Sequence, residues 1–408
     1  MAEMPVPEEP LIETEAELLA LADHLRQCGR FAFDTEFVSE ETFEPVLCLI
    51  QVATPDRLAV IDPLAIRDIA PFWRVATDPA VEVVMHAAGE DLRICRFQTG
   101  TVPAHLFDVQ IAAGLVGFSF PLSLGNLVHH VLGISLAGGE TRTDWRRRPL
   151  SPAQLRYALD DVRYLLPIAD RLGSELAGLG RAEWATTEMT SFVSGIQNRT
   201  EEDRWRRLPG LHTLSRRGLE IARRLADWRI DAARRANRPV RQMLRDDLLV
   251  AIAKRQPAGR RELEALRDFN RPNLLRQAPE ILALIAEAQA VPASDLPEHA
   301  ERHDDGPGLS MVASLLAASL TRCCAQQRVA AALVGTSSDV KDLIRWHAEG
   351  KPEPRRPALA CGWRGEVCGQ TLLDVLSGRI TLRVVDPSAE VPIALEPINR
   401  AAERAYED

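Results

Sequence analysis

Four carboxylates in three separated segments are the side chains of this chain best suited to chemistry: Asp34 with Glu36, then Asp91, then Asp161. Each lies in or beside an apolar segment, where a charged oxygen is costly to bury unless a positive charge meets it. Four acids gathered without cations would repel one another and take up protons. With two divalent ions about 4 Å apart, the same acids would form a clamp for in-line attack on phosphorus. The pattern therefore favours a site for paired Mg²⁺ or Mn²⁺ ions.

The first two acids occur in the apolar segment Phe31–Phe37, which is typical of a β-strand. Residues two apart on a strand share a face at a spacing of roughly 7 Å. Asp34 and Glu36 are therefore expected to project together, with the phenylalanines packed on the opposite face. A strand at the edge of a sheet with one solvated face would show the same pattern.

The third acid, Asp91, follows His86 and a turn of small residues after the strand predicted at Val81–Met85. The pattern indicates a strand, a tight turn and the first turn of a helix. An acid in that first turn also complements the helix dipole, which is worth about 0.5 kcal/mol. His86 is a candidate for contact with nucleic acid, although taken alone it also fits a core histidine with satisfied hydrogen bonds.

The fourth acid, Asp161, lies four residues after Tyr157 in a segment with helical periodicity. Residues four apart share one stripe of a helix, whereas Asp160 points elsewhere. Tyr157 is then placed to orient a water molecule or a phosphate group. An ordinary exposed helix face would also carry a tyrosine and an aspartate.

The elements that must position these residues form a mixed α/β pattern over about residues 12–172. The first three predicted strands follow one another closely, which favours an antiparallel meander. Ser151 as N-cap, Pro152 at the first helical position and Gln154 mark a helix start, and Pro167 is expected to kink that helix. The expected strands are Phe31–Phe37, Val46–Ala53, Leu58–Ile61 and Val81–Met85, and the expected helices are Glu15–Gln27, Glu90–Gln98, Val109–Leu115, Leu124–Val131 and Pro152–Leu176.

Beyond residue 180 the strand signals nearly vanish and amphipathic helices are expected. Residues 213–290 predict short helices broken near Pro239, Pro257, Pro272 and Pro279, and further helices are expected at Leu309–Ala332, Ser338–Glu349 and Glu366–Ser377. We therefore predict a mixed α/β domain over residues 1–200, a helical domain over 210–292, a polar linker over 293–308 and a second helical domain over 309–408.

Composition excludes several other classes of protein. The chain has 408 residues, 46% of them hydrophobic and 26% charged, as in a soluble globular protein of two or three domains. No secretory signal is recognised, and no stretch reaches the 18 or so uncharged apolar residues of a membrane span. Seven cysteines without CxxC spacing favour reduced thiols in a cytoplasm. Neither Cys323 with Cys324 nor Cys361 with Cys368 forms a zinc knuckle, so no structural zinc is expected.

Basic residues are concentrated away from the acids. The net charge is −9, yet residues 201–276 hold twenty Lys/Arg against eleven Asp/Glu. Arginines there, such as Arg223 and Arg234, could follow a phosphate backbone or form a solvated helix face. Trp145 with Arg147 could stack on a base and hold a phosphate. Alternatively, Trp145 packs the loop and the arginine is solvated.

Three motifs resemble those of ribonuclease D, a family of the DEDD exonuclease superfamily. FAFDTEF resembles the first motif, HAAGEDL the second and YALDD the third, in its tyrosine form. Residues 213–290 resemble the helical (HRDC-type) module shared by helicases and ribonuclease D C-termini, and residues 309–390 its final helical region more loosely. The fold implied is a ribonuclease H-like nuclease domain, a five-stranded mixed sheet flanked by helices, followed by all-α C-terminal domains.

The same resemblance implies a function. Asp34, Glu36, Asp91 and Asp161 would hold two metal ions, and Tyr157 would replace the histidine base of the sister subgroup. The reaction implied removes nucleotides from single-stranded RNA 3′ ends as nucleoside 5′-monophosphates, with tRNA precursors as substrates. Two alternatives remain open: a 3′–5′ DNA exonuclease with the same site, and a non-catalytic nucleic-acid-binding scaffold. The stretch Leu136–Glu140 departs from the family because it lacks a lysine. This difference bears on a phosphate contact made from that loop and not on the metal site.

Overall fold

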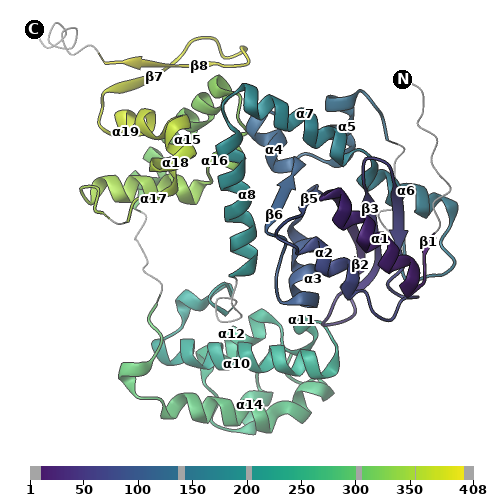
Figure 1. Cartoon of the computed structure of the whole chain (residues 1–408). Helices are drawn as coiled ribbons and strands as arrows, with labels where there is room; N and C mark the ends of the chain where they lie inside the picture. Colours follow the sequence, from purple (N-terminus) through teal and green to yellow (C-terminus); the bar gives the residue numbers. More distant parts are fainter. Residues whose placement is uncertain (1–10, 137–142, 199–204, 300–305, 354, 399–408) are drawn as a thin grey trace, which may run out of the picture.

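The nuclease region is built on one mixed β-sheet (Figure 1). The computed structural model describes residues 11–136, 143–198, 205–299, 306–353 and 355–398. The strands are β1 (Leu11–Ile12), β2 (Arg30–Val38), β3 (Val46–Ala53), β4 (Leu58–Ile61), β5 (Glu82–Met85) and β6 (His105–Asp108). Their order is β1-β4-β3-β2-β5-β6. The pairs β2–β3 and β3–β4 are antiparallel, and the pairs β1–β4, β2–β5 and β5–β6 are parallel.

The mixed sheet and its antiparallel meander confirm the sequence prediction, and β3 and β4 begin and end where they were expected. The sheet has six strands instead of five. The additional edge strand, β1, has only two residues and too little pattern to be recognised. Strand β6 was also missed, because its four residues, HLFD, carry no alternation that separates them from a loop.

Two helical layers cover the sheet. One layer contains α1 (Glu15–Cys28), α2 (Ala70–Ala76) and α3 (Gly89–Thr99). Phe31 and Phe33 of β2 are fully buried on this face, and the Phe33 ring meets Phe72 of α2 edge-on at 5.5 Å. The other layer contains α4 (Val109–Val116), α5 (Leu124–Leu132), α6 (Pro152–Arg163) and α7 (Leu165–Gly178). Strand β2, with a neighbour on each side, is therefore central, and the edge-strand alternative is wrong.

The predicted helix over residues 152–176 is two helices. The Ser151 hydroxyl accepts from the Gln154 N–H while the Gln154 side chain accepts from the Ser151 N–H, which confirms the predicted start. The chain departs from helical continuity at Tyr164, where α6 ends and α7 begins. Pro167 explains this position, because it has no N–H for the carbonyl four residues earlier, that of Arg163, and its ring crowds that carbonyl.

A 16-residue helix that was not predicted, α8 (Ala182–Gln197), runs from the nuclease region toward the first helical region (Figure 1). That region contains η1 (Leu211–Thr213), α10 (Arg216–Ala236), α11 (Val240–Met243), α12 (Asp246–Arg255), α13 (Arg260–Glu264) and α14 (Pro272–Ala290). It has a hydrophobic core of its own, from Trp205 to Ala288. The break expected at Pro279 is wrong. Pro279 lies inside α14, where the buried neighbours Ala278, Ile281 and Ile285 stabilise the helix despite the missing hydrogen bond.

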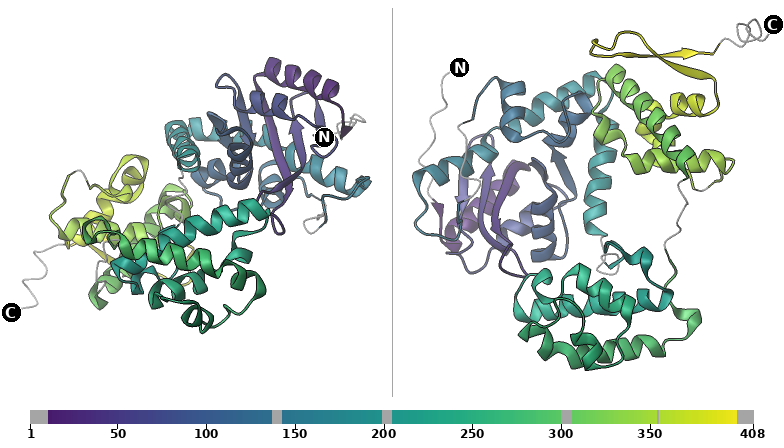
Figure 2. Two further views of the ribbon diagram at one scale, coloured as in Figure 1. Left: turned by 90° about the horizontal axis from the view of Figure 1, so that it is seen from below. Right: turned by 180° about the vertical axis from the view of Figure 1, so that it is seen from behind.

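The last helical region shares its core with the nuclease region. It contains α15 (Pro307–Gln327), α16 (Ala331–Val334), α17 (Ser337–Ala348), α18 (Gly362–Arg364), the π-helix η4 (Gly365–Gly369) and α19 (Gln370–Leu376), with a short 3₁₀ turn at Ala358–Ala360; another such turn, Ala293–Asp295, lies before this region. The Ala330 N–H donates to the Gly114 carbonyl of α4 at 2.8 Å. The Arg181 guanidinium, at the start of α8, donates to the Leu115 carbonyl of α4 at 2.7 Å and to the Arg328 carbonyl at 3.1 Å. Figure 2 shows this region against α4 and α8 from two further sides.

Two features of this last region differ from expectation. The C-terminal part was expected to be all-α, but it ends in a hairpin of β7 (Ile380–Val384) and β8 (Ile393–Pro397). These two short strands pair with each other. Within the described residues, one helical segment, Gly308–Gln327 of α15, is long and apolar enough to cross a membrane by length and composition, with a mean hydropathy of 1.4. Leu316 and Leu320 of this helix are buried in the protein core.

Candidate active site

Strand β2 carries Asp34 and Glu36 on the face opposite Phe31 and Phe33. The two acids are half-buried, and Thr35 between them is buried on the phenylalanine side. The Thr35 hydroxyl donates a 2.5 Å hydrogen bond to the Asp91 carboxylate. A bulge follows between Glu36 and Phe37, which ends the regular register with β3 after the second acid.

Asp91 is held in the first turn of α3 by a strained turn. Ala87 has a φ of +56°, an uncommon conformation for a residue with a side chain. The Asp108 carboxylate accepts from the N–H groups of Ala87 and Ala88 at 3.2 and 3.0 Å, and it also caps α4 through the Gln110 N–H at 2.8 Å. Asp108 is thus a positioning residue that sequence reasoning missed. Its place before an apolar helix in FDVQIAA was the available signal.

Helix α6 contributes Asp161 and Tyr157, whose side chains are hydrogen-bonded to each other. The buried Trp145 lies against Tyr157, with ring centroids 6.0 Å apart. The neighbouring acid, Asp160, instead forms an ion pair with Arg163 at 3.0 Å. The structure therefore separates two adjacent aspartates in the way that helical spacing predicted.

Burial raises the pKa of all four carboxylates, and for Asp34 and Glu36 the charges of other acids in the group raise it further. Burial, followed by the charges of Asp91, Asp161 and Glu36, raises the pKa of Asp34 well above its usual value. Burial, then the charges of Asp161 and Asp91, raises the pKa of Glu36 to about 8. Burial is also the largest cause for Asp91, whose pKa rises to about 6, and for Asp161, whose pKa rises to about 7.

These acids lack the positive partners that buried carboxylates normally have. Among the described residues, none of the four forms an ion pair with an arginine, lysine or histidine. No three of them bring an oxygen atom each within 4.8 Å of one another. The acids therefore do not converge on one point. Carboxylate oxygens are the ligands that hard divalent cations prefer, so the residues present fit the metal ions that the fold implies.

The residues proposed to contact nucleic acid are mostly engaged within the protein. The His86 ring lies 2.9 Å from the Leu122 carbonyl oxygen, and burial is the main reason that its pKa is lowered. Trp145 is buried and supports Tyr157. Arg223 pairs with Glu220, and Arg234 pairs with Asp231 while lying over the Phe43 ring at 5.3 Å.

Arg147 has a side chain that is 84% exposed, with Asp144 as a partner at 3.8 Å. The adjacent Arg148 is structural, because its guanidinium donates to both oxygens of the buried Asp62, at 2.5 and 2.8 Å. The lysine-free stretch 136–140 lies outside the described residues except for Leu136.

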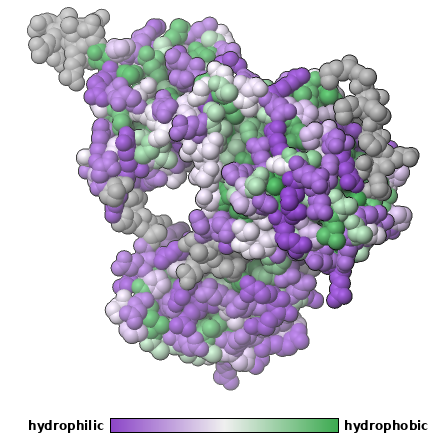
Figure 3. Space-filling view, viewed as in Figure 1, coloured by the Kyte–Doolittle hydropathy of each residue, from purple (hydrophilic) through white to green (hydrophobic). Residues whose placement is uncertain are grey.

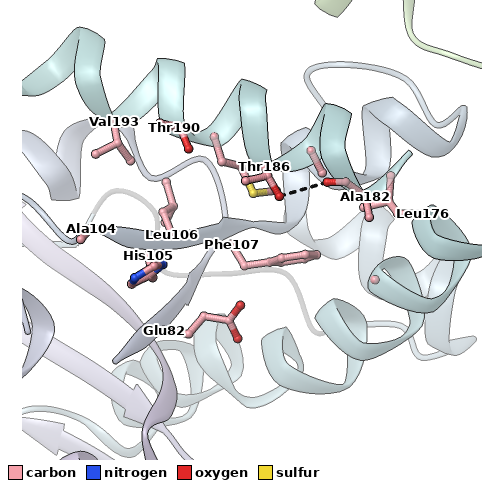
Figure 4. A pocket seen from close by; sticks show the side chains of 13 residues that line it. Glu82, Ala104, His105, Leu106, Phe107, Leu176, Ala182, Thr186, Thr190 and Val193 are labelled. Atoms are coloured by element: carbon pink, nitrogen blue, oxygen red, sulfur yellow. Dashed lines mark hydrogen bonds between the residues drawn. The ribbon is translucent and has the colours of Figure 1, made fainter. Parts of the chain in front are cut away.

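Two cavities lie elsewhere. One, of about 250 Å³, is formed by β5 and β6 with α7 and α8, and Figure 4 shows Glu82, His105 and Thr186 around it. The other, between α8, the turn at Ala87 and the last helical region, includes Asp108 and Arg364. None of the four carboxylates lines either cavity. The acids therefore form a site separate from both cavities.

Comparison with known proteins agrees with this arrangement. Residues 10–177 match the family described as 3'-5' exonuclease, residues 218–285 match the HRDC domain, and residues 307–372 match the C-terminal HRDC domain of ribonuclease D. Fold and sequence thus define a 3′–5′ exonuclease followed by two HRDC domains.

Similarity to individual proteins extends over nearly the whole chain. The chain is 33% identical to ribonuclease D of Cronobacter turicensis, over 90% of this chain and 99% of the relative. It is 36% identical to ribonuclease D of Granulibacter bethesdensis, over 93% and 95%. The crystal structure of Escherichia coli RNase D, described as an exoribonuclease involved in structured RNA processing, matches with a TM-score of 0.80 at 32% identity, over 91% of this chain and 99% of that one. The chain therefore belongs to the ribonuclease D family of exoribonucleases.

Proposed function

We propose that this exoribonuclease works with two divalent ions, Mg²⁺ or Mn²⁺, held by Asp34, Glu36, Asp91 and Asp161. The proposed reaction releases nucleoside 5′-monophosphates from RNA 3′ ends. When bound, the ions would lower the pKa of an attacking water and neutralise charge on the leaving oxygen. The observation that carries the proposal is the group of four mutually repelling acids that lack positive partners among the described residues.

The protein's own groups would hold and orient the reactants. Burial, then the charge of Asp161, raises the pKa of Tyr157 above its usual value, so the hydroxyl keeps its proton at neutral pH. We therefore assign Tyr157 as a hydrogen-bond donor that orients the scissile phosphate or the attacking water, and not as a base. Trp145 behind the ring and Thr35 beside Asp91 limit the motion of these groups.

Substitution of single acids tests the proposal. Asp34→Asn or Asp161→Asn removes a charged ligand at nearly constant volume, and several kcal/mol of lost stabilisation corresponds to about a thousandfold loss of kcat. Asp160→Asn is the matched control, because Asp160 is adjacent in sequence but pairs with Arg163. Mg²⁺-dependent degradation by pure Asp34→Asn protein at the wild-type rate would refute the mechanism.

Substrate and location belong to the same proposal. The E. coli relative is described as acting in structured RNA processing, and we propose tRNA precursors with single-stranded 3′ ends as substrates of this chain. Digestion of matched RNA and DNA strands tests the sugar preference, because recognition of the 2′-hydroxyl distinguishes the two. All seven cysteines are free thiols, which supports a cytoplasmic location.

A further inference from the structure

A second group of metal-ligating side chains lies away from the four carboxylates. His24 and Cys28 are on α1, one helical turn apart, and Asp56 lies in the turn between β3 and β4. Their ligand atoms lie within 4.8 Å of one another, and this is the one such set of three found among the described residues. No local motif predicted the group, because Asp56 comes from a different element than the other two.

The distances match the edges of a metal-centred tetrahedron. The His24 Nε2 atom lies 3.6 Å from the Cys28 sulfur and 3.4 Å from an Asp56 oxygen. Zinc binds nitrogen at about 2.0–2.1 Å, sulfur at about 2.3 Å and oxygen at about 2.0–2.2 Å. At tetrahedral angles these bonds separate nitrogen from sulfur by about 3.6 Å and nitrogen from oxygen by about 3.4 Å. The two observed edges therefore already have the lengths that one ion requires.

The surrounding structure supports both ends of the group. Gly29, in a left-handed conformation with φ of +65°, ends α1 directly after Cys28. The Thr54 hydroxyl donates to the Asp56 oxygen at 2.8 Å, and it also lies 3.2 Å from the His24 nitrogen. Such a second hydrogen bond orients a metal-binding carboxylate. The side chains of His24 and Asp56 are 26% and 72% exposed, which leaves a path for an ion and for water.

We propose that His24, Cys28 and Asp56 bind one transition-metal ion of the zinc class, with water as the fourth ligand. A nitrogen, sulfur and oxygen set favours such ions over Mg²⁺, which prefers oxygen alone. Binding replaces the thiol proton of Cys28 with a metal–sulfur bond and releases that proton to solvent. Because the thiol must lose its proton to bind the ion, affinity increases with pH.

The two sites would then select different ions. The four carboxylates provide only oxygen ligands, whereas the group at His24 provides a thiolate. An ion bound there would tie α1 to the β3–β4 turn, and α1 leads through Gly29 directly into the strand that carries Asp34.

Cobalt(II) absorption tests the proposal on the full-length protein after treatment with a chelator. Co²⁺ bound by a thiolate shows a sulfur-to-metal charge-transfer band in the near ultraviolet, whereas Co²⁺ bound by the four carboxylates does not. We expect one equivalent of Co²⁺ to produce the band, excess Zn²⁺ to remove it, and Cys28→Ser to abolish it. Cys361→Ser is the matched control, because Cys361 is similarly half-buried but lies outside the group.

Asp56→Asn provides an independent variant, because it replaces a side chain that is 72% exposed with one of nearly the same volume. We expect its Co²⁺ affinity to fall by at least about tenfold, as even the loss of a group that orients a ligand has this effect. The absence of the band in wild-type protein, or its persistence in Cys28→Ser, would overturn the proposal. An unchanged affinity in Asp56→Asn would overturn the three-ligand assignment.

Discussion

The carboxylates around Asp34 and the arginines of α10 are both dense groups of like charge, but their surroundings differ. Burial raises the pKa of all four carboxylates, and the charges of neighbouring acids raise the pKa of Asp34 and Glu36 further. None of the four has a cationic partner among the described residues. Glu220 of α10 is also buried, at 1% exposure, yet Arg223 and Arg224 both donate to it at 2.7 Å. Burial tends to raise the pKa of Glu220, but these hydrogen bonds and charges outweigh it and lower the pKa.

The other arginines of α10 are engaged in the same way. Arg217 donates to the Ala288 carbonyl at 2.7 Å, and Arg229 donates to Asp246 at 2.5 Å. The result is a hydrophilic surface over this helical region (Figure 3) in which many charges already have partners. Like charge that lacks counter-charge therefore indicates a site for ligands, whereas the same density with partners in place indicates architecture.

The largest expected effect that sharpens this contrast is on catalysis. Tyr157→Phe removes one hydrogen-bond donor and leaves all four carboxylates, so kcat should fall by about 10²–10³ while Mn²⁺ affinity is retained. Single-turnover rates and Mn²⁺ titration of the same preparation separate the two quantities. An equal loss of metal affinity would show that Tyr157 acts by holding Asp161 and not by orienting the reactants.

The second effect is on stability and has opposite signs in the two regions. Glu220→Gln removes the buried charge that Arg223 and Arg224 both contact, so the free energy of unfolding should decrease by about 1–3 kcal/mol with kcat unchanged. Asp34→Asn removes repulsion, so the metal-free protein should become more stable while activity is lost. Urea unfolding in the presence of a chelator measures both. A destabilised Asp34→Asn variant would contradict the account of repulsion.

The third effect is the pH dependence of stability in metal-free protein. Asp91, Asp161 and Glu36 have raised pKa values of about 6, 7 and 8, so between about pH 4 and these values the folded state binds more protons than the unfolded state. Stability from these groups is therefore present at low pH and is lost as pH rises to about 8. The Tm of chelated wild-type protein should decrease from pH 6 to pH 8 more steeply than that of the Asp34→Asn, Asp161→Asn double variant. Equal slopes of Tm against pH in the two proteins would contradict the claim that these carboxylates have raised pKa values.

The smallest expected effect is on the salt dependence of RNA binding. Arg147 is exposed near the acids, so Arg147→Ala should reduce the slope of log affinity against log salt by about 1, the value for one lost phosphate contact. Arg234 already pairs with Asp231, so Arg234→Ala should leave the slope unchanged. A reduced slope for Arg234→Ala with an unchanged slope for Arg147→Ala would indicate that α10 contacts RNA.

Local patterns predicted those parts of the fold that local interactions determine. The capping box at Ser151 and Gln154, the meander from β2 to β4 and the choice of Asp161 over Asp160 all follow from spacing within one element. The proline at 279 was misjudged because packing of α14 outweighs its intrinsic cost.

Features that depend on distant partners could not be predicted in this way. Trp145 is buried because Tyr157 and the face of α6 meet it, and Arg148 is structural because Asp62 lies opposite. The role of Asp108 depends on the turn at Ala87, which comes from another strand. A single sequence gives these residues but no information on which of them are in contact.

Diffraction from Mn²⁺-soaked crystals, with the anomalous signal of manganese, tests the central claim most directly. We predict two anomalous peaks about 4 Å apart among Asp34, Glu36, Asp91 and Asp161, with both peaks lost in Asp34→Asn crystals. A pocket without manganese at saturating concentration, or any of the four side chains turned toward bulk solvent beside bound ions, would contradict the claim.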